Sequence, residues 1–491
     1  MVLTLHHVTV EEVYALLEPL LQKGSSEAKR KGHSVMVSAS VPITFEGSLA
    51  SVVDMGLKDA QFATYWHDGP NGLERATYGE TALEIYSGAR AFDRASTASV
   101  RLFQEVITGE TARTAAFLGT AFDASRKRGT PWERWPDVLL AIPMFSIERE
   151  TSARAYLTVT LRVGQNDTLR DVKKSTEQAL RKLLELSTQK RTVRRRGSGL
   201  GDLRIDEAQA PEAGIDEAYR TLVSQATEDM RKGSYEKVVH ARMMDVTHRV
   251  TAFAATLENL AYDHPSSTVF GIAWRGDVFL GATPERLVGM RKGQLYIDCL
   301  AGTAPRFADR EQDEQAGQAL LASKKDLHEH RLVLAGIESA LEGVATKPTY
   351  KDPQLRRLPN LQHLYTPVRA EALRDVTIVS VAARLQPTPA VAGWPRAKAL
   401  RVIREREEVD RGWYAGALGF IERDGSGEMV VALRSALVKD DRAYLFAGAG
   451  LVADSDPIRE EGETTLKMQV MKRALCLSSE EKNAKEDPRE S

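Results

Sequence analysis

Four acidic side chains lie in two short motifs in the second half of the chain. Asp326 and Glu329 are three residues apart in Lys-Lys-Asp-Leu-His-Glu-His, and Glu460 and Glu463 are three apart in Arg-Glu-Glu-Gly-Glu. Residues three apart share one face of a helix, and two such faces could form one Mg²⁺ site with oxygen-only ligands. The structural alternative is that Glu460 complements a helix dipole in its first turn while Glu463 pairs with Lys467.

Lys237 is a second candidate, in the segment Tyr-Glu-Lys-Val-Val-His-Ala-Arg. Strand alternation places it on the same face as Val239 and Ala241, which is the apolar face. A lysine that points into a dry interior can act as a base near neutral pH. A lysine at the end of a strand can instead extend its stem to water, so the residue alone leaves both interpretations open.

Two further motifs could hold the carboxylates of a ligand. Gly448-Ala449-Gly450 can expose backbone amides to an anion, and Arg434 in Leu-Arg-Ser-Ala can form paired hydrogen bonds with a carboxylate. A Gly-x-Gly segment also serves as an ordinary tight turn. The chain contains no P-loop, GxGxxG, GxSxG or HExxH motif, which argues against nucleotide-binding, serine-hydrolase and zinc-protease functions.

Composition and charge exclude other classes. The 491 residues are 42% hydrophobic and 27% charged, as in soluble globular proteins. The 67 basic and 68 acidic residues leave a net charge of −1, so we expect neither nucleic acid nor a membrane as a partner.

Cys299 and Cys476 form no disulfide or zinc spacing, which suits a reducing compartment. No apolar run reaches the ~20 residues that span a bilayer, and the N-terminus lacks a signal-peptide pattern, so we expect a cytoplasmic protein.

The first part of the chain mixes helical and strand patterns. Hydrophobic periodicity predicts helices at residues 10–23 and 168–186 and strands at 34–39 and 154–163, and Thr9-Val10-Glu11-Glu12 is typical of a helix start. A basic run at residues 190–196 then leads into a Gly- and Ser-containing stretch. We interpret residues 188–214 as a solvated linker between two parts of the chain.

The second part must position the candidate residues. It predicts a helix at residues 215–232, a strand at 236–245 and a helix that begins near 251. Strands at 268–274, 278–282, 286–291 and 294–301, separated by turn-forming residues, predict an antiparallel meander, and a second meander is expected at 415–451. Helices at 310–343 and 395–408 interrupt the strands without regular alternation. The expected fold class is therefore α+β, with large, mainly antiparallel sheets packed with helices.

Nine segments in order resemble the chorismate-utilising enzymes, with isochorismate synthase of the menaquinone-pathway type as the closest match. They are Tyr-Glu-Lys-Val-Val-His-Ala-Arg, Gly-Ala-Thr-Pro-Glu-Arg-Leu-Val, Leu-Ala-Gly-Thr-Ala-Pro-Arg, Lys-Asp-Leu-His-Glu-His, Gln-His-Leu-Tyr-Thr-Pro, Leu-Gln-Pro-Thr-Pro-Ala-Val-Ala-Gly-Trp-Pro, Arg-Gly-Trp-Tyr-Ala-Gly, Leu-Arg-Ser-Ala and Phe-Ala-Gly-Ala-Gly-Leu-Val. The resemblance covers roughly residues 218–477. It implies a chorismate-binding catalytic region at 215–478, an N-terminal α/β extension of the same fold at 1–205, and a charged, disordered tail at 479–491.

The resemblance also implies a role for each candidate residue. Lys237 becomes the base that activates water, and Glu285 becomes the acid that protonates the departing C4 hydroxyl of chorismate. Glu329 and Glu463 become direct Mg²⁺ ligands, with Asp326 and Glu460 holding metal-bound waters. The residues that would hold the substrate are Thr303, His363, Tyr414, Arg434, Lys467 and the amides of Gly448, Ala449 and Gly450.

Three positions bear on which reaction the chain performs. Anthranilate synthases resemble this chain but usually carry glutamine at Lys237, and aminodeoxychorismate synthases carry lysine at Ala301, so water is the expected nucleophile. Salicylate synthases, which add a pyruvate elimination, remain an alternative. Gln386 replaces the histidine usual in the family and cannot titrate near pH 7. An inactive chorismate-binding relative is the third possibility, and the sequence indicates neither the pathway served (menaquinone, siderophore or salicylate) nor the oligomeric state.

Overall fold

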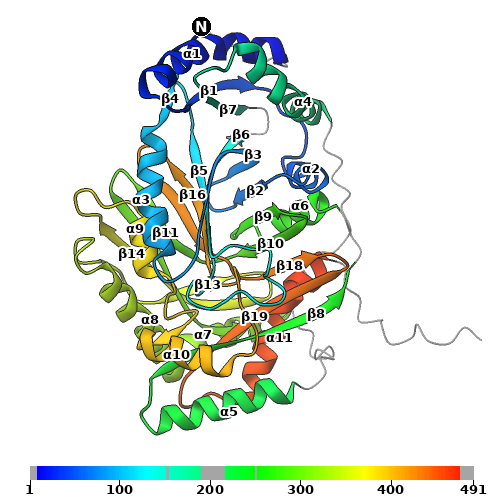
Figure 1. Ribbon diagram of the computed structural model, residues 1–491. Coiled ribbons are helices and arrows are strands. Elements are labelled where there is room, and N and C mark those ends of the chain that lie inside the picture. Colours follow the sequence, from blue (N-terminus) through cyan, green and yellow to red (C-terminus); the bar gives the residue numbers. More distant parts are fainter. Residues whose placement is uncertain (1–7, 151–153, 190–215, 249–251, 476–491) are drawn as a thin grey trace, which may run out of the picture.

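The computed structural model describes residues 8–150, 154–189, 216–248 and 252–475 (Figure 1). The basic run at 190–196, most of the expected linker and the charged tail lie outside the described residues. The chain has the α+β fold that the sequence predicted, with helices around extensively paired strands. The described helices are α1 (Val10–Lys31), α2 (Ser51–Asp59), α3 (Ala91–Gln104), α4 (Leu169–Thr188), α5 (Glu217–Arg231), α6 (Ala254–Asp263), α7 (Arg310–Ala322), α8 (Lys324–Leu341), α9 (Ile378–Leu385), α10 (Arg396–Arg406) and α11 (Pro457–Ala474).

Side-chain caps fix the starts of several helices. Thr9 and Glu12 form the capping box expected for α1. Residues 310–343 hold two helices, because Ser323 is extended (φ −70°, ψ 113°) and its side chain accepts a hydrogen bond from the Asp326 amide at the start of α8. Asp456 caps α11, with Pro457 in its first turn. The caps of α8 and α11 therefore set the orientation of the two acidic motifs.

The strands form one branched network. β6 pairs with β3 along one edge and with β5 and β7 along the other. Apart from the parallel pair β1–β4, the pairings between the described strands are antiparallel. The strands are β1 (Val35–Ile43), β2 (Ala63–Asp68), β3 (Leu73–Tyr86), β4 (Val106–Thr108), β5 (Ala115–Thr120), β6 (Val138–Arg149), β7 (Ala155–Val163), β8 (Lys237–Thr247), β9 (Thr268–Trp274), β10 (Asp277–Thr283), β11 (Arg286–Arg291), β12 (Gln294–Pro305), β13 (Gln354–Arg357), β14 (Leu361–Glu371), β15 (Gly393–Trp394), β16 (Ala417–Glu422), β17 (Gly427–Val431), β18 (Ser435–Lys439) and β19 (Arg442–Leu451).

Two long limbs extend from β6, and a short third branch runs β7, β1 and β4. The first limb runs in spatial order β3, β2, β9, β10, β18, β19, β8 and β15. The second limb runs β5, β16, β17, β11, β12, β14 and β13. Each limb combines strands from before and after the expected boundary, since β2 pairs with β9 and β5 pairs with β16.

The prediction of two continuous meanders was wrong. Each segment forms two hairpins, one on the first limb and one on the second. β9 pairs with β10 and β11 with β12, but the chain crosses from the first limb to the second between β10 and β11. It crosses back between β17 and β18. Thr-Pro-Glu at residues 283–285, one of the turns expected between the predicted strands, is thus a crossover that carries Glu285, and the returning crossover carries Arg434. The two crossovers bond to each other, because Val431 N donates to Glu285 O (3.1 Å) and Ala282 N to Arg434 O (3.2 Å).

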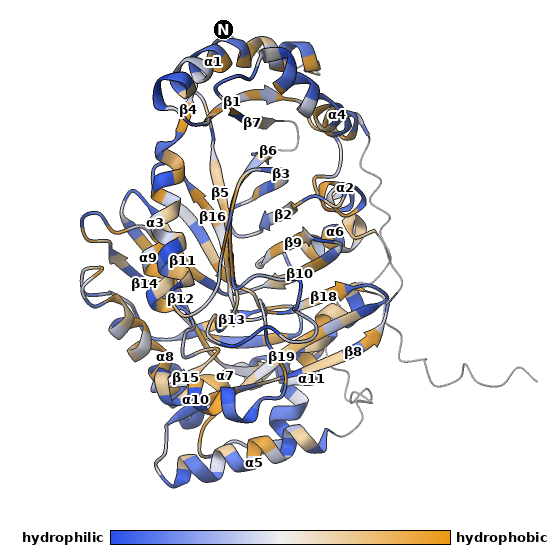
Figure 2. Ribbon diagram, in the orientation of Figure 1, coloured by the Kyte–Doolittle hydropathy of each residue, from blue (hydrophilic) through white to orange (hydrophobic). Residues whose placement is uncertain are grey.

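Apolar side chains fill the space between the limbs. Phe117 of β5 stacks on Trp413 (ring centroids 6.5 Å apart), and Trp66 of β2 meets Phe420 of β16 edge to face (5.8 Å). Figure 2 shows the strands as predominantly hydrophobic and the surrounding helices as mixed. A second buried cluster packs α1, with α4 beside it, against β1 and β7, and packs α2 and α6 against strands of the first limb.

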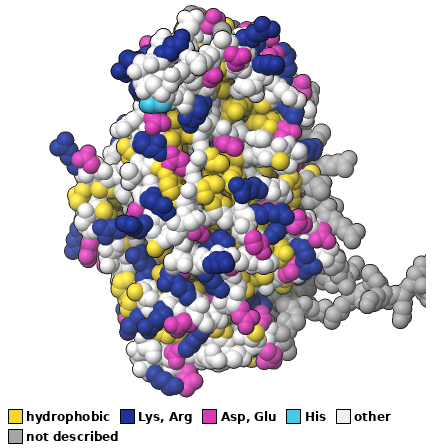
Figure 3. All heavy atoms as spheres, in the orientation of Figure 1, with side chains coloured by type: hydrophobic (Ala, Val, Ile, Leu, Met, Phe, Trp, Pro, Cys, Tyr) yellow, Lys and Arg dark blue, Asp and Glu magenta, His cyan; other side chains and the backbone are white. Residues whose placement is uncertain are grey.

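The surface carries charges of both signs. Lys and Arg side chains intermingle with Asp and Glu over the face shown in Figure 3, in keeping with the net charge of −1. Within the described ranges, no helix is long and apolar enough to cross a membrane.

Candidate active site

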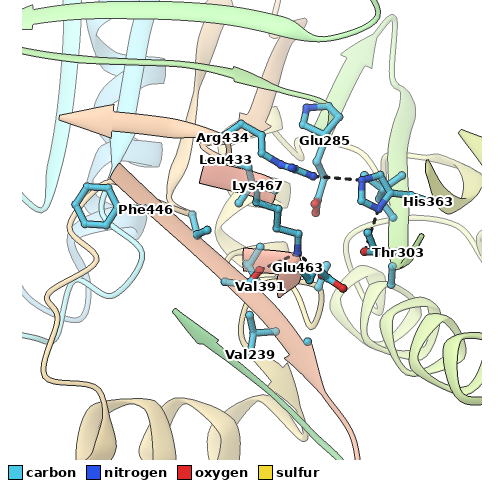
Figure 4. Close-up of a pocket in the computed structure, with 18 of the residues that line it drawn as sticks. Val239, Glu285, Thr303, His363, Val391, Leu433, Arg434, Phe446, Glu463 and Lys467 are labelled. Atoms are coloured by element: carbon cyan, nitrogen blue, oxygen red, sulfur yellow. Dashed lines mark hydrogen bonds and ion pairs between the residues drawn. The ribbon is translucent and has the colours of Figure 1, made fainter. Parts of the chain in front are cut away.

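A cavity lies where the two limbs meet α8 and α11 (Figure 4). Both limbs and both helices contribute side chains to its wall. Ten of the residues expected from the sequence line it: Glu285, Thr303, Glu329, His363, Tyr414, Arg434, Gly448, Gly450, Glu463 and Lys467. Segments up to about 180 residues apart in the chain therefore converge on one enclosed space.

Glu285 is a buried acid held in its protonated form. Its side chain is 4% exposed at the first crossover. Burial raises the pKa of Glu285 to about 8, the nearby Asp298 carboxylate adds to this, and the Lys237 and Lys467 ammonium groups oppose it. At neutral pH Glu285 is thus a carboxylic acid with a proton to donate.

Arg434, His363 and Thr303 form a hydrogen-bonded row along one wall. Arg434 Nη2 donates to His363 Nε2 (3.3 Å), and His363 Nδ1 lies 3.3 Å from both Gly302 O and Thr303 Oγ1. Burial holds the pKa of His363 well below its usual range, so the ring is neutral. Because Arg434 can only donate, Nε2 is the accepting nitrogen and Nδ1 carries the proton.

Arg434 has an unused donor in this row. Among the described residues, its buried Nη1 has no hydrogen-bond partner. Burial lowers the pKa of Arg434 to about 10, which leaves the guanidinium charged at neutral pH. A buried cationic donor without a partner is unfavourable, so this group favours binding of an anion in the cavity.

The glycines of β19 present backbone amides at a free strand edge. Val239 N donates to Ala392 O (2.9 Å) and Ala241 N to Glu407 (3.0 Å), so these two residues direct their amides away from β19. Their partners across the ladder, Gly450 and Gly448, therefore direct theirs away from β8. β18 pairs with β19 only as far as Phe446, which leaves that edge open beyond it. Figure 4 shows Lys467 at this edge, where its Nζ donates to Gly448 O (2.8 Å).

Lys237 is fully buried, and the interpretation in which its stem reaches water was wrong. Its Nζ lies 2.8 Å from Glu329 Oε1. The contact needs a glycine opposite, because a Cβ at Gly450 would lie 2.2 Å from Glu329 Oε1 and 3.1 Å from Lys237 Cε. Lys237 and Glu329 thus form an ion pair beneath the glycine segment of β19.

The other acidic residues also have polar partners. Lys467 Nζ lies 2.6 Å from Glu463 Oε1, as in the structural alternative, and Lys325 Nζ lies 2.9 Å from Glu460 Oε1. Ser323 bonds to Asp326. In the described part of the chain, no group of three or more His, Cys, Asp or Glu residues is arranged to hold a metal ion. Lysine ammonium groups thus provide counter-charge to three of the four acids.

Four expected residues lie outside the cavity wall. Lys237 lies behind Glu329, and Asp326 and Glu460 lie one helical turn before the lining acids. The side chain of Ala449 is buried on the opposite face of β19, so only its backbone belongs to the site.

Sequence reasoning missed other parts of the wall. Arg411, Val391 and Phe446 line the cavity, and Tyr414 stacks on Phe446 with ring centroids 5.4 Å apart. Arg411 begins the motif Arg-Gly-Trp-Tyr-Ala-Gly, so this motif could have indicated that Arg411 belongs to the site.

Comparisons with known proteins agree with this geometry. The family described as "chorismate binding enzyme" matches residues 22–476. The salicylate biosynthesis isochorismate synthase of Pseudomonas aeruginosa is 38% identical over 358 residues, which cover 73% of this chain and 73% of that protein. The chain belongs to the chorismate-binding enzymes. The isochorismate synthase MenF of Bacillus subtilis is 29% identical over 467 residues, 91% of this chain and 95% of that protein.

A solved structure in this family has the same fold. The menaquinone-specific isochorismate synthase MenF of Escherichia coli superposes with a TM-score of 0.70 at 25% identity, covering 94% of this chain and 99% of that one. The match includes the N-terminal strands as well as the region that carries the motifs. The N-terminal part of this chorismate-binding enzyme is therefore part of the shared fold.

Proposed function

We propose that this protein is an isochorismate synthase that converts chorismate to isochorismate. In this reaction water adds at C2, the double bonds shift and the C4 hydroxyl leaves. The relatives described above, all named isochorismate synthases, support the assignment. The single structural observation that carries it is Glu285, a buried acid that keeps its proton at neutral pH inside a cavity with an unpartnered guanidinium.

Hydroxide is a poor leaving group, so its departure needs a proton donor. A pKa of about 8 makes Glu285 such a donor near neutral pH. Lys237 is proposed as the base that takes a proton from the attacking water. A positioned acid or base typically contributes 10²- to 10⁴-fold in rate. Its Nζ lies 2.8 Å from Glu329 Oε1, so Lys237 must leave this contact before it can act as the base.

The substrate carries two carboxylates, and the cavity offers two sets of donors. Arg434 Nη1 and Lys467 are cationic, and the amides of Gly448 and Gly450 face the open edge of β19. We assign these groups to the substrate carboxylates. Thr303 and His363 belong to the wall that would face the ring, and Tyr414 closes the side next to Phe446.

We also propose that Mg²⁺ is the cofactor. The donor set fits, because Glu329 and Glu463 line the cavity, all four acids offer oxygen ligands, and lysines now supply the charge that a cation would replace. Asp326 and Glu460 would hold metal-bound waters one turn away. When bound, the ion would neutralise a substrate carboxylate that otherwise repels charge building up in the ring.

Incubation of the purified protein with chorismate tests the proposal. With Mg²⁺ we expect isochorismate as the main product by chromatography, and in ¹⁸O-labelled water the label should appear in the new C2 hydroxyl. Lys237→Ala should lose at least ~10²-fold in kcat with little change in substrate binding. A Lys237→Ala variant with full activity would refute the assigned base.

Two alternatives give different products. A salicylate synthase would release mainly salicylate and pyruvate. The name of the Pseudomonas aeruginosa relative refers to salicylate biosynthesis, which supports testing for these products. An inactive relative would bind chorismate and return it unchanged. Coverage of 94% of this chain by the menaquinone-specific enzyme favours menaquinone synthesis as the pathway served.

A further inference from the structure

A buried ion pair lies next to the cavity and is not used by the proposed chemistry. The guanidinium of Arg411 binds the carboxylate of Glu407 in a fork, with Nε donating to Oε2 (2.8 Å) and Nη2 to Oε1 (2.5 Å). The two side chains are 2% and 1% exposed. Burial alone would raise the pKa of Glu407, but Arg411 and His240 outweigh it and lower this pKa to about 2. The pair is therefore charged at neutral pH.

This ion pair lies along the edge of β8 that no other described strand covers beyond Val238. The short strand β15 pairs with β8 only at Lys237 and Val238. Beyond that point Val239 N still donates to Ala392 O (2.9 Å), but the next two groups of β8 are held by side chains, because Arg411 Nη2 donates to Val239 O (2.7 Å) and Glu407 accepts from Ala241 N (3.0 Å). The ion pair thus continues the edge of the sheet along the strand that begins at Lys237.

The same guanidinium holds a second wall of the cavity. Arg411 Nη1 donates to Val391 O (2.8 Å), and the backbone carbonyl of Arg411 accepts from Tyr414 N (2.9 Å). Its N–H groups are engaged with Glu407 and two backbone carbonyls, whereas Arg434 keeps an unused Nη1. Arg434 is thus suited to bind a ligand, and Arg411 is suited to fix the walls around it.

The N-terminal part of the chain supports this arrangement from outside. The ring of Phe122 lies 4.2 Å from the Arg411 guanidinium, and Phe122 N donates to Gly412 O (2.7 Å). Arg128 forms an ion pair with Asp410 (2.9 Å), whose other oxygen accepts from Gly129 N (2.8 Å). Residues 122–129 therefore hold the turn that carries Arg411.

We propose that Arg411 and Glu407 are positioning residues of the active site. They fix the start of β8, and with it Lys237, relative to the wall formed by Val391 and Tyr414. They contact backbone rather than reacting atoms, so they act through Lys237. The kinetic part of this inference rests on the proposed function, and the structural part does not.

The kinetic test uses Arg411→Lys and Glu407→Gln, which keep hydrogen-bonding ability but lose the fork. We expect kcat to fall by about 10- to 100-fold, the size of effect that misplaced catalytic groups produce, with KM changed far less. Arg30→Gln is the control, because it breaks a surface ion pair with Glu27 within α1, on an element that does not line the cavity, and should leave kcat unchanged.

A double-variant comparison separates positioning from general damage. If Arg411 acts through Lys237, then Arg411→Lys should cost little in a Lys237→Ala protein that already lacks the base. Losses that multiply in the double variant, or single variants with full kcat, would overturn the proposal.

Hydrogen exchange gives a readout that needs no activity. The amide of Ala241, which donates to Glu407, should lose protection in Arg411→Lys and Glu407→Gln, while the amides in β1 stay protected as in the unmodified protein. Unchanged exchange in β8 would overturn the structural claim. A protein that forms no isochorismate but shows this loss of protection would refute the proposed function and leave the positioning pair standing.

Discussion

Replacing Glu285 by Gln removes the buried acid while keeping its size. An amide cannot donate a proton to departing hydroxide, so we expect kcat to fall by about 10²- to 10⁴-fold, the contribution of one positioned acid. Chorismate binding should change little, because Arg434, Lys467 and the β19 amides remain. Steady-state kinetics with a direct measurement of binding would distinguish the two effects.

The pH profile follows from the raised pKa. With a pKa of about 8, Glu285 is about 90% protonated at pH 7, whereas a glutamate of ordinary pKa would be only about 0.3% protonated. Activity of the unmodified enzyme should therefore decline about tenfold per pH unit above pH 8. The residual activity of Glu285→Gln should lack this decline.

Stability gives an independent check with a definite sign. The pKa of Glu285 is raised from 4.5 to about 8, so the folded state holds a proton that the unfolded state releases between these values. Its contribution to stability is fully present below pH 4.5 and is lost as pH rises to 8, by about 5 kcal/mol as an order of magnitude. Glutamine does not ionise, so Glu285→Gln does not lose this stability. The variant should therefore become more stable relative to the unmodified protein as pH rises.

Denaturation midpoints of the two proteins at pH 5 and pH 8.5 would measure this gain. Glu405→Gln is a suitable control, because Glu405 is exposed on α10 and should give no pH-dependent difference. If Glu285→Gln shifts the midpoint equally at both pH values and keeps the alkaline decline in activity, Glu285 is not the protonated acid and the mechanism fails.

Three other changes have definite expected outcomes. Activity should disappear in excess chelator, and Glu329→Gln or Glu463→Gln should nearly abolish it; full turnover with chelator would exclude the metal. Gln386→His should alter the rate or its pH profile but not the product, because Gln386 Nε2 donates to Ala415 O (3.0 Å) outside the proposed proton transfers; activity that appears only with histidine would favour the inactive-relative interpretation. Gly450→Ala should destabilise the protein and remove activity, since its Cβ would overlap Glu329, whereas Gly462→Ala, with no atom within 4 Å of its Cβ, should be neutral or stabilising in thermal unfolding.

Local sequence patterns predicted several strands in the second part of the chain well, but missed β2 to β6 in the first part and predicted α7 and α8 as one helix. The strands at 268–274 and 286–291 match β9 and β11, because alternating apolar residues between clear turn signals leave little ambiguity. The ordered motifs also predicted ten of the residues that line the cavity. Such motifs retain the residue types that a reaction needs.

Long-range contacts were beyond what the sequence could predict. Turn-forming residues at Thr-Pro-Glu indicate a change of direction but not whether the next strand pairs with the last one. The partners of the acids could not be assigned either, apart from Glu463 with Lys467, which are one helical turn apart. Arg411 was missed because its contacts, Val239, Val391 and Phe122, are distant in sequence.

The branched sheet limits how this enzyme can be shortened. A fragment that begins at residue 216 would keep every motif, yet β9 would lose its partner β2 and β16 would lose β5. Each would then present a bare row of amides and carbonyls, which invites pairing with other chains. Phe122 and Arg128 would be absent beside Arg411 and Asp410 as well. The motif-bearing region is thus not a transferable module, and a minimal enzyme must retain the strands and the loop that come before it.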